Sequence, residues 1–104
     1  IYTSAKAYTE TLDDKSTIDR LGLEIYNTNI NYNTAGQSGG AIYVENTASA
    51  LFKDVTMTYN TSGYNGGALF AGDSSNIRTY YEIRIDGNTT PAYNYLNIDT
   101  LSIG

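Results

Sequence analysis

Two stretches of this 104-residue sequence nearly repeat each other. Residues 57–70 read MTYNTSGYNGGALF, and residues 30–43 read INYNTAGQSGGAIY. Seven of the fourteen aligned positions are identical, and the apolar residues at the two ends are exchanged conservatively. The offset between the stretches is 27 residues. A fixed period of this length indicates an architecture built from structural repeats.

A third and weaker copy follows at residues 85–89, which read IDGNT and lie 28 residues after residues 57–61. A bulky apolar residue five positions upstream of each copy recurs at Ile25, Phe52 and Tyr80. Residues 98–103 resemble residues 52–57, but their closer spacing predicts an abbreviated last coil. The third copy therefore extends the repeat beyond the two clearest ones.

The apolar residues alternate with polar ones rather than recurring at helical spacing, most clearly in EIRID at residues 82–86. Clusters of Gly, Asn, Asp and Ser separate these segments, as turns require. A period of 27 residues is too short for a propeller blade of about 40 residues, and two-residue hairpin turns are missing. We therefore expect an all-β fold, a single-stranded parallel β-helix (β-solenoid) of about three to four short coils.

One domain is expected over residues 1–104, with the coils in residues 21–104. Residues 1–20 fit the repeat poorly, so we expect an irregular N-terminal segment there, serving as a cap or as a strand donated to a neighbouring copy. Within it, only Ala5–Arg20 has a composition that would permit a short helix. The sequence ends in strand-like residues 101–104 without a polar cap, although solenoids normally cap their ends.

Stacked coils place identical residues above one another, about 4.8 Å apart. Gly pairs suit a sharp corner where one residue takes a positive φ and adjacent backbones approach closely, and a following Ala leaves little volume. The expected corner residues are Gly39, Gly40, Ala41, Gly66, Gly67 and Ala68. An inward-turned amide in each coil would bond to its counterpart above, so we also predict an asparagine ladder. Its members are Asn33, Asn60 and Asn88.

Two of these ladder positions also begin N-glycosylation sequons, Asn60-Thr61-Ser62 and Asn88-Thr89-Thr90. A laddered amide inside a corner cannot carry a glycan. We therefore interpret Asn60 as structural, while Asn88 keeps both interpretations.

Tyrosine occurs 11 times and recurs through the coils. Tyr32 and Tyr59 occupy equivalent positions between an inward apolar residue and an inward Asn, so we expect them to point outward and stack. Outward aromatic residues pack within the solenoid, bury against a neighbouring subunit or bind sugars. The expected contact surface consists of Tyr32, Tyr59, Tyr80 and Tyr81.

The chain contains no His and no Cys, which excludes catalytic triads, cysteine nucleophiles, disulfides and zinc sites with nitrogen or sulfur ligands. The remaining candidates are Asp13-Asp14, and Asp54 with Glu82 and Arg84. Asp54 and Glu82 align one coil apart, and such a pair is either a calcium site or solvated surface. We expect no enzyme activity, catalytic residue, cofactor or metal.

A net charge of −5 argues against nucleic-acid partners, and no apolar run is long enough to span a bilayer.

Gly39-Gly40-Ala41-Ile42 and Gly66-Gly67-Ala68-Leu69, each preceded by an apolar residue three positions before Asn33 or Asn60, resemble a known pattern. They are similar to the GGA(I/L/V) and FxxN motifs of the chlamydial polymorphic outer membrane proteins and of related autotransporter passengers. The resemblance covers about residues 21–75. It implies a right-handed parallel β-helix that is exported, lies at the cell surface and acts in adhesion.

From these patterns we expect an extracellular structural or adhesive solenoid that self-associates head to tail into a surface filament, because such pairing does not close. Two alternatives remain: a fragment of a larger adhesin passenger, and a carbohydrate-binding or carbohydrate-active β-helix module. The expected partners are further copies of the chain and, in adhesion, a host or cell-surface glycan or protein.

Overall fold

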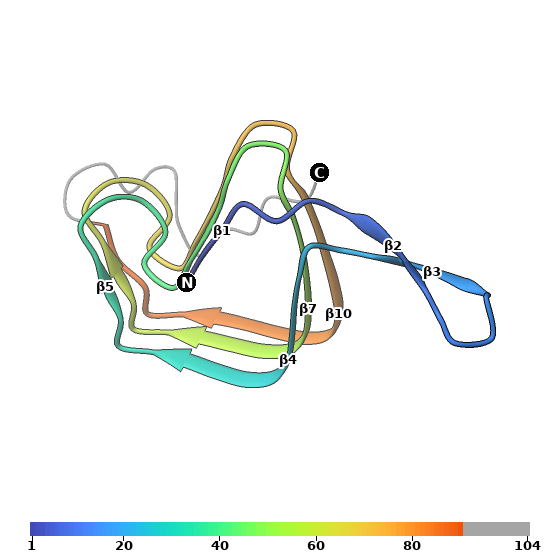
Figure 1. Ribbon diagram of the computed structural model, residues 1–104. Coiled ribbons are helices and arrows are strands. Elements are labelled where there is room, and N and C mark those ends of the chain that lie inside the picture. Colours follow the sequence, from blue (N-terminus) through green and yellow to red (C-terminus); the bar gives the residue numbers. More distant parts are fainter. Residues whose placement is uncertain (91–104) are drawn as a thin grey trace.

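The computed structural model describes residues 1–90, and all regular secondary structure in that range is β-strand (Figure 1). The prediction of an all-β fold is confirmed. The abbreviated coil expected at residues 98–103 lies outside the described residues. Residues 1–90 contain no helix long and apolar enough to cross a bilayer.

Three long strands form the largest sheet, in the order β10-β7-β4. They are β4 (Leu23–Asn31), β7 (Ser49–Thr58) and β10 (Asn76–Asp86). All three run parallel, and β4 pairs with β7 at a constant offset of 27 residues, from Leu23 opposite Ala50 to Asn31 opposite Thr58. We call residues 22–48, 49–75 and 76–90 repeats 1, 2 and 3. Equivalent residues of successive repeats thus lie side by side.

Two smaller parallel sheets continue this pairing (Figure 1). One has the order β1-β6-β9 and consists of β1 (Tyr2–Thr3), β6 (Ile42–Val44) and β9 (Leu69–Ala71). The other joins β5 (Thr34–Ala35) to β8 (Thr61–Ser62), and a single bridge between Thr61 and Thr89 extends it to repeat 3.

The register of β10 corrects one alignment made from the sequence. Phe52 lies opposite Thr79, whereas Tyr80 lies opposite Lys53. The register shifts between Tyr80 and Ile83, after which Ile83 lies opposite Val55 at an offset of 28. Tyr80 is therefore not the counterpart of Ile25 and Phe52, because the extra residue enters as a β-bulge only after it.

The N-terminal segment forms an antiparallel hairpin, β2 (Tyr8–Thr11) and β3 (Thr17–Arg20), where the composition had permitted a helix. Lys15 closes its turn in the left-handed region, with φ of 70°, and its N–H donates to the Leu12 carbonyl at 2.9 Å. The Asp14 carboxylate accepts the Ser16 N–H at 2.9 Å and the Ser16 hydroxyl at 2.6 Å. These hydrogen bonds hold the pKa of Asp14 below its ordinary value.

Residues 1–5 lie along repeat 1 of their own chain. β1 pairs with β6, and the carbonyls of Ile1, Thr3 and Ala5 accept backbone hydrogen bonds of 2.7 to 2.9 Å. The donors are Tyr43, Glu45 and Ser49. In this chain the segment therefore covers the open edge of β6.

Left-handed backbone recurs at four corners of the repeat, including positions that carry side chains. The equivalent sets are Asn27, Asp54 and Tyr81; Tyr32, Tyr59 and Gly87; Gly39 and Gly66; Thr47 and Ser74. Positive φ is strained for residues other than Gly. Because it recurs at the same place in each repeat, the stacking of one repeat on the next maintains it.

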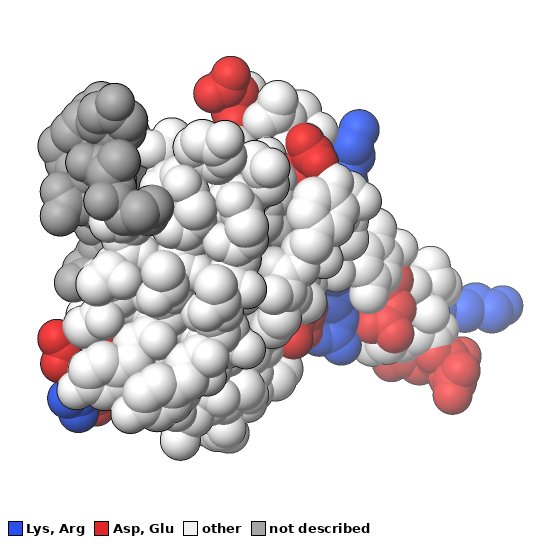
Figure 2. Space-filling model, turned by 90° about the vertical axis from the view of Figure 1, so that its left-hand side faces the viewer, with Lys and Arg blue, Asp and Glu red and all other residues white. Residues whose placement is uncertain are grey.

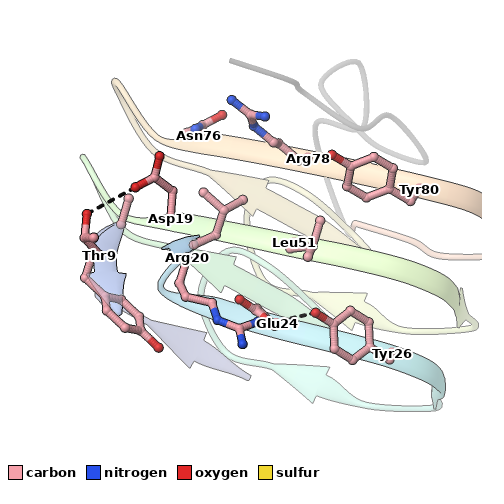
Figure 3. A pocket seen from close by; sticks show the side chains of 12 residues that line it. Thr9, Asp19, Arg20, Glu24, Tyr26, Leu51, Asn76, Arg78 and Tyr80 are labelled. Atoms are coloured by element: carbon pink, nitrogen blue, oxygen red, sulfur yellow. Dashed lines mark hydrogen bonds and ion pairs between the residues drawn. The ribbon is translucent and has the colours of Figure 1, made fainter. Parts of the chain in front are cut away.

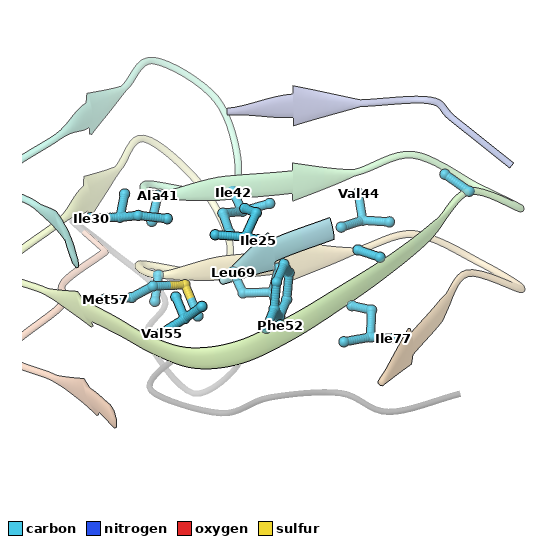
Figure 4. Close-up of a cluster of buried hydrophobic side chains, with 13 residues drawn as sticks. Ile25, Ile30, Ala41, Ile42, Val44, Phe52, Val55, Met57, Leu69 and Ile77 are labelled. Atoms are coloured by element: carbon cyan, nitrogen blue, oxygen red, sulfur yellow. The ribbon is translucent and has the colours of Figure 1, made fainter. Parts of the chain in front are cut away.

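The core lies between the β4-β7-β10 sheet and the smaller sheets (Figure 4). β7 contributes the fully buried side chains of Phe52, Val55 and Met57. Ile42 and Leu69 face them from β6 and β9, and Ile77 packs beside them from β10. Burial of apolar surface stabilises a fold by roughly 25 cal/mol per Å². These core side chains are therefore expected to be the main source of stability.

Candidate functional site

The Gly pairs divide two tasks between them. Gly39 and Gly66 take φ of 78° and 68°, which only the first Gly of each pair does. The second Gly provides space: a Cβ on Gly40 would overlap the Gly67 carbonyl oxygen, and one on Gly67 would lie 2.8 Å from the Thr89 amide nitrogen. The Ala residue that follows each pair is also buried, at positions 41 and 68. At this corner the backbones of successive repeats lie too close together for a side chain at the second Gly.

The three asparagines are joined in a continuous hydrogen-bonded row. The Asn60 side-chain oxygen accepts from the backbone and side-chain amides of Asn33, at 2.9 and 3.0 Å. The Asn88 side-chain oxygen accepts the corresponding pair from Asn60, at 2.8 and 2.9 Å. Asn60 also donates to the Ile30 carbonyl at 2.9 Å. Because Asn60 is fully buried, all of its side-chain hydrogen bonds are within the protein.

This row bears on both sequons. The Asn60 side-chain nitrogen, which a glycan would occupy, donates to the Ile30 carbonyl and to Asn88. The Asn88 side-chain nitrogen donates to the carbonyls of Met57 and Asp86, at 2.9 and 3.1 Å. A glycan on either residue is incompatible with these contacts in the folded chain.

Stacked aromatic rings form two columns across the repeats. Tyr32 and Tyr59 stack at 5.3 Å between ring centroids with an interplanar angle of 13°. Gly87 occupies the equivalent position in repeat 3, where the Tyr59 ring lies against it. The second column joins Tyr2, Tyr43 and Phe70 with centroid distances of 5.5 and 5.0 Å. We did not select this column from the sequence, although Tyr43 and Phe70 end the two quoted stretches at equivalent positions.

Tyr80 and Tyr81 lie apart from both columns. Both are exposed, and Tyr81 faces the Lys53 ammonium, whose nitrogen lies 4.9 Å from the ring centroid. On the other side the same nitrogen lies 6.0 Å from the Tyr26 ring centroid. The four tyrosines expected to form one contact surface thus belong to two separate groups.

Asp54 and Glu82, the predicted carboxylate pair, contact each other through the backbone amide of Glu82. The Glu82 N–H donates to the Asp54 carboxylate at 3.3 Å. Within residues 1–90, no group of three or more acidic side chains is arranged to hold a metal ion. Elsewhere, hydrogen bonds to Glu45 and Glu24 raise the pKa of Tyr2 and Tyr26, respectively, because a neighbouring carboxylate opposes phenolate formation.

The two ends of the large sheet differ from its middle. Within the described residues, β7 pairs on both sides, whereas β4 and β10 pair only with β7. Four of the nine residues of β4 are exposed, whereas one of the ten residues of β7 is. One face of the stack also carries few charges, which lie mostly toward its margins (Figure 2). The stack therefore has open strand edges and a largely uncharged side.

The profile of the Chlamydia polymorphic membrane protein repeat matches the chain at two places, residues 27–45 and 54–72. Two segments of the chain are thus similar to this repeat. Each match begins at a left-handed corner, at Asn27 or Asp54, and includes a ladder asparagine and a Gly-Gly-Ala corner. The resemblance inferred from the motifs is confirmed. Comparisons with curated proteins and with solved structures find no match.

The two segments that match the family model follow the structural period. The two matched segments are offset by 27 residues, as are β4 and β7. Each repeat combines left-handed corners, an inward amide and a close backbone approach. The motif residues thereby specify how one repeat lies on the next.

Proposed function

We propose that this chain forms a right-handed parallel β-helix that serves as an exposed structural and adhesive element at the cell surface, without a catalytic role. Copies associate head to tail into a filament. The cell-surface assignment rests on the polymorphic membrane protein repeats and on a polar surface poor in charge and free of Cys. The three stacked repeats, paired in parallel at offsets of 27 and 28 residues, support the β-helix.

The observation that carries the filament is the open edge of β4. β1 covers the edge of β6, but within residues 1–90 no strand covers β4, whose nine residues form the longest such edge at that end of the stack. An uncovered edge of this length is a template for another strand. At the other end β10 is parallel to β7, and within residues 1–90 no strand pairs with its far edge, which would be the complementary edge. Pairing β10 of one copy with β4 of the next continues the same parallel ladder, and such a heterologous contact gives a fibre.

If the chain is a fragment of a larger adhesin passenger, the edges of β4 and β10 are covered in another way. In a longer adhesin, neighbouring coils of the same polypeptide would cover β4 and β10, and the isolated chain would then have no need to polymerise. The two proposals therefore differ in what the purified chain does at high concentration.

A single edge substitution tests the filament. The Tyr32 N–H donates to the Thr58 carbonyl of repeat 2, and strand N–H groups alternate in direction. The N–H of Asn29 therefore points toward the open side. Pro is tolerated at such an edge position but blocks further pairing. We expect concentrated wild-type protein to form fibres in electron micrographs, with matching growth in light scattering, and Asn29→Pro to remain monomeric.

Asn29→Ala is the matched control, because it changes the side chain and keeps the N–H. It should polymerise like the wild type. Equal fibre formation by Asn29→Pro and Asn29→Ala would rule out the β4 edge, and a wild type that stays monomeric at all concentrations would leave the passenger fragment as the better account.

A further inference from the structure

A groove of about 500 Å³ lies between the outer face of the large sheet and the N-terminal hairpin (Figure 3). A second hollow of about 460 Å³ shares Tyr26, Leu51 and Tyr80 with it and extends it toward Lys53 and Tyr81. Together they form an elongated depression that crosses all three repeats.

Two outward rows of side chains form the floor of the groove. In register, one row consists of Glu24, Leu51 and Arg78, and the other of Tyr26, Lys53 and Tyr80. Tyr26 and Tyr80 are separated by two strand spacings, about 10 Å. Both rings are exposed, Lys53 lies between them in register, and the apolar Leu51 lies in the neighbouring row. The floor thus presents two aromatic rings far enough apart to contact two different units of a short linear ligand.

The hairpin wall is fastened to this floor by Arg20. Its guanidinium contacts Glu10 on β2 at 2.9 Å and Glu24 on β4 at 3.3 Å. Glu24 in turn accepts the Tyr26 hydroxyl at 2.6 Å. These contacts orient the Tyr26 ring and hold the wall in place, so much of the site is formed before a ligand arrives.

Polar groups at the rim are available to a ligand. Within residues 1–90, the side chains of Arg78 and Asn76 make no hydrogen bond or ion pair, and both line the groove. Asp19 lies opposite, held by the Thr9 hydroxyl at 3.2 Å. The charged lining of the whole depression comprises three cationic groups, of Arg20, Arg78 and Lys53, and two carboxylates, of Asp19 and Glu24. One excess positive charge on a chain with net charge −5 makes a weak site for a strongly anionic ligand.

We propose that this groove binds a neutral, hydroxyl-rich oligosaccharide. The rings of Tyr26 and Tyr80 contact the apolar faces of two sugar units, and Arg78, Asn76 and Asp19 exchange hydrogen bonds with the hydroxyls. Aromatic surfaces combined with a few convergent polar groups are typical of small-ligand sites. A peptide added as a strand needs an open backbone edge, whereas this floor consists of side chains on a sheet face. The site lies within one chain and does not depend on filament formation.

Isothermal titration calorimetry tests this with soluble hexasaccharides as probes: a β-glucan, an α-glucan and a mannan as neutral ligands, and a heparin hexasaccharide as the anionic one. We expect saturable binding of at least one neutral probe. Tyr80→Ala and Arg78→Ala should each raise its Kd at least about tenfold, which corresponds to about 1.4 kcal/mol. Tyr80→Phe keeps the ring and should bind within about threefold of wild type.

Tyr64→Ala is the matched control, because Tyr64 is an exposed tyrosine outside the groove. Its Kd should stay within about twofold of wild type, and melting curves should show that every variant is folded. The proposal is overturned if no neutral probe binds at millimolar concentration, if only heparin binds, or if Tyr64→Ala weakens binding as much as Tyr80→Ala.

Discussion

Repeats 1 and 2 carry closely similar sequences but differ in how their equivalent residues are buried. Asn60 of repeat 2 is fully buried, whereas its counterpart Asn33 is exposed. Phe52 is likewise inaccessible, while Ile25 opposite it retains 9% of its surface. Within residues 1–90, repeat 2 has a neighbouring repeat on each side, whereas β4 of repeat 1 pairs with one strand. The comparison shows that position in the stack, rather than residue type, sets how much each motif residue contributes to stability.

The largest effect is expected at Gly40, where the backbones of the two repeats lie close together. Gly40→Val places a side chain onto the Gly67 carbonyl oxygen, where backbone rather than a flexible side chain blocks it. Overpacking typically costs about 1–3 kcal/mol, and it costs more where rigid backbone blocks the new side chain, against a total stability of about 5–15 kcal/mol for a small domain. We expect Gly40→Val to lose its cooperative thermal transition.

The control for this variant is Gly36→Val in the same repeat, because a Cβ on Gly36 meets nothing within 4 Å. Its melting temperature should fall by only a few degrees. Equal melting of Gly40→Val and the wild type would contradict the close stacking of the two corners.

A smaller difference is expected between the equivalent asparagines. Asn60→Ala removes an amide that accepts from Asn33 and donates to Ile30 and Asn88, and it leaves buried groups without partners. We expect urea denaturation to show a loss of about 2–3 kcal/mol for Asn60→Ala and of about 1 kcal/mol or less for Asn33→Ala. Similar losses for the two variants would show that stacking does not determine the contribution of the ladder.

The sequence predicted the features that arise where identical residues of successive repeats lie opposite each other. The quoted stretches align Asn33 with Asn60 and Gly40 with Gly67, and the structure pairs these repeats at the same offset of 27. The bulge after Tyr80 was not predictable, since a single inserted residue can enter at several positions without changing the alternation of apolar residues. The error at Tyr80 followed from placing it too early.

Other features had no signal of their own in the sequence. Tyr32, Tyr59 and Thr47 take positive φ although such side chains disfavour it, and only the stacked backbone explains this. The sequence did not predict the hairpin, because both faces of its strands are largely exposed and its residues do not alternate between apolar and polar. The groove depends on that hairpin, so Arg78 and Tyr26 could not be assigned to a common site.

Amide hydrogen exchange, followed by mass spectrometry in dilute and concentrated samples, tests the central claim most directly. In the dilute monomer we expect the slowest exchange in β7, with β4 and β10 faster because within residues 1–90 each of them pairs on one side only. On assembly, β4 and β10 should become as protected as β7. Uniform exchange across the three strands in the monomer would contradict the stacked-repeat account, and unchanged exchange of β4 in fibres would contradict end-to-end pairing.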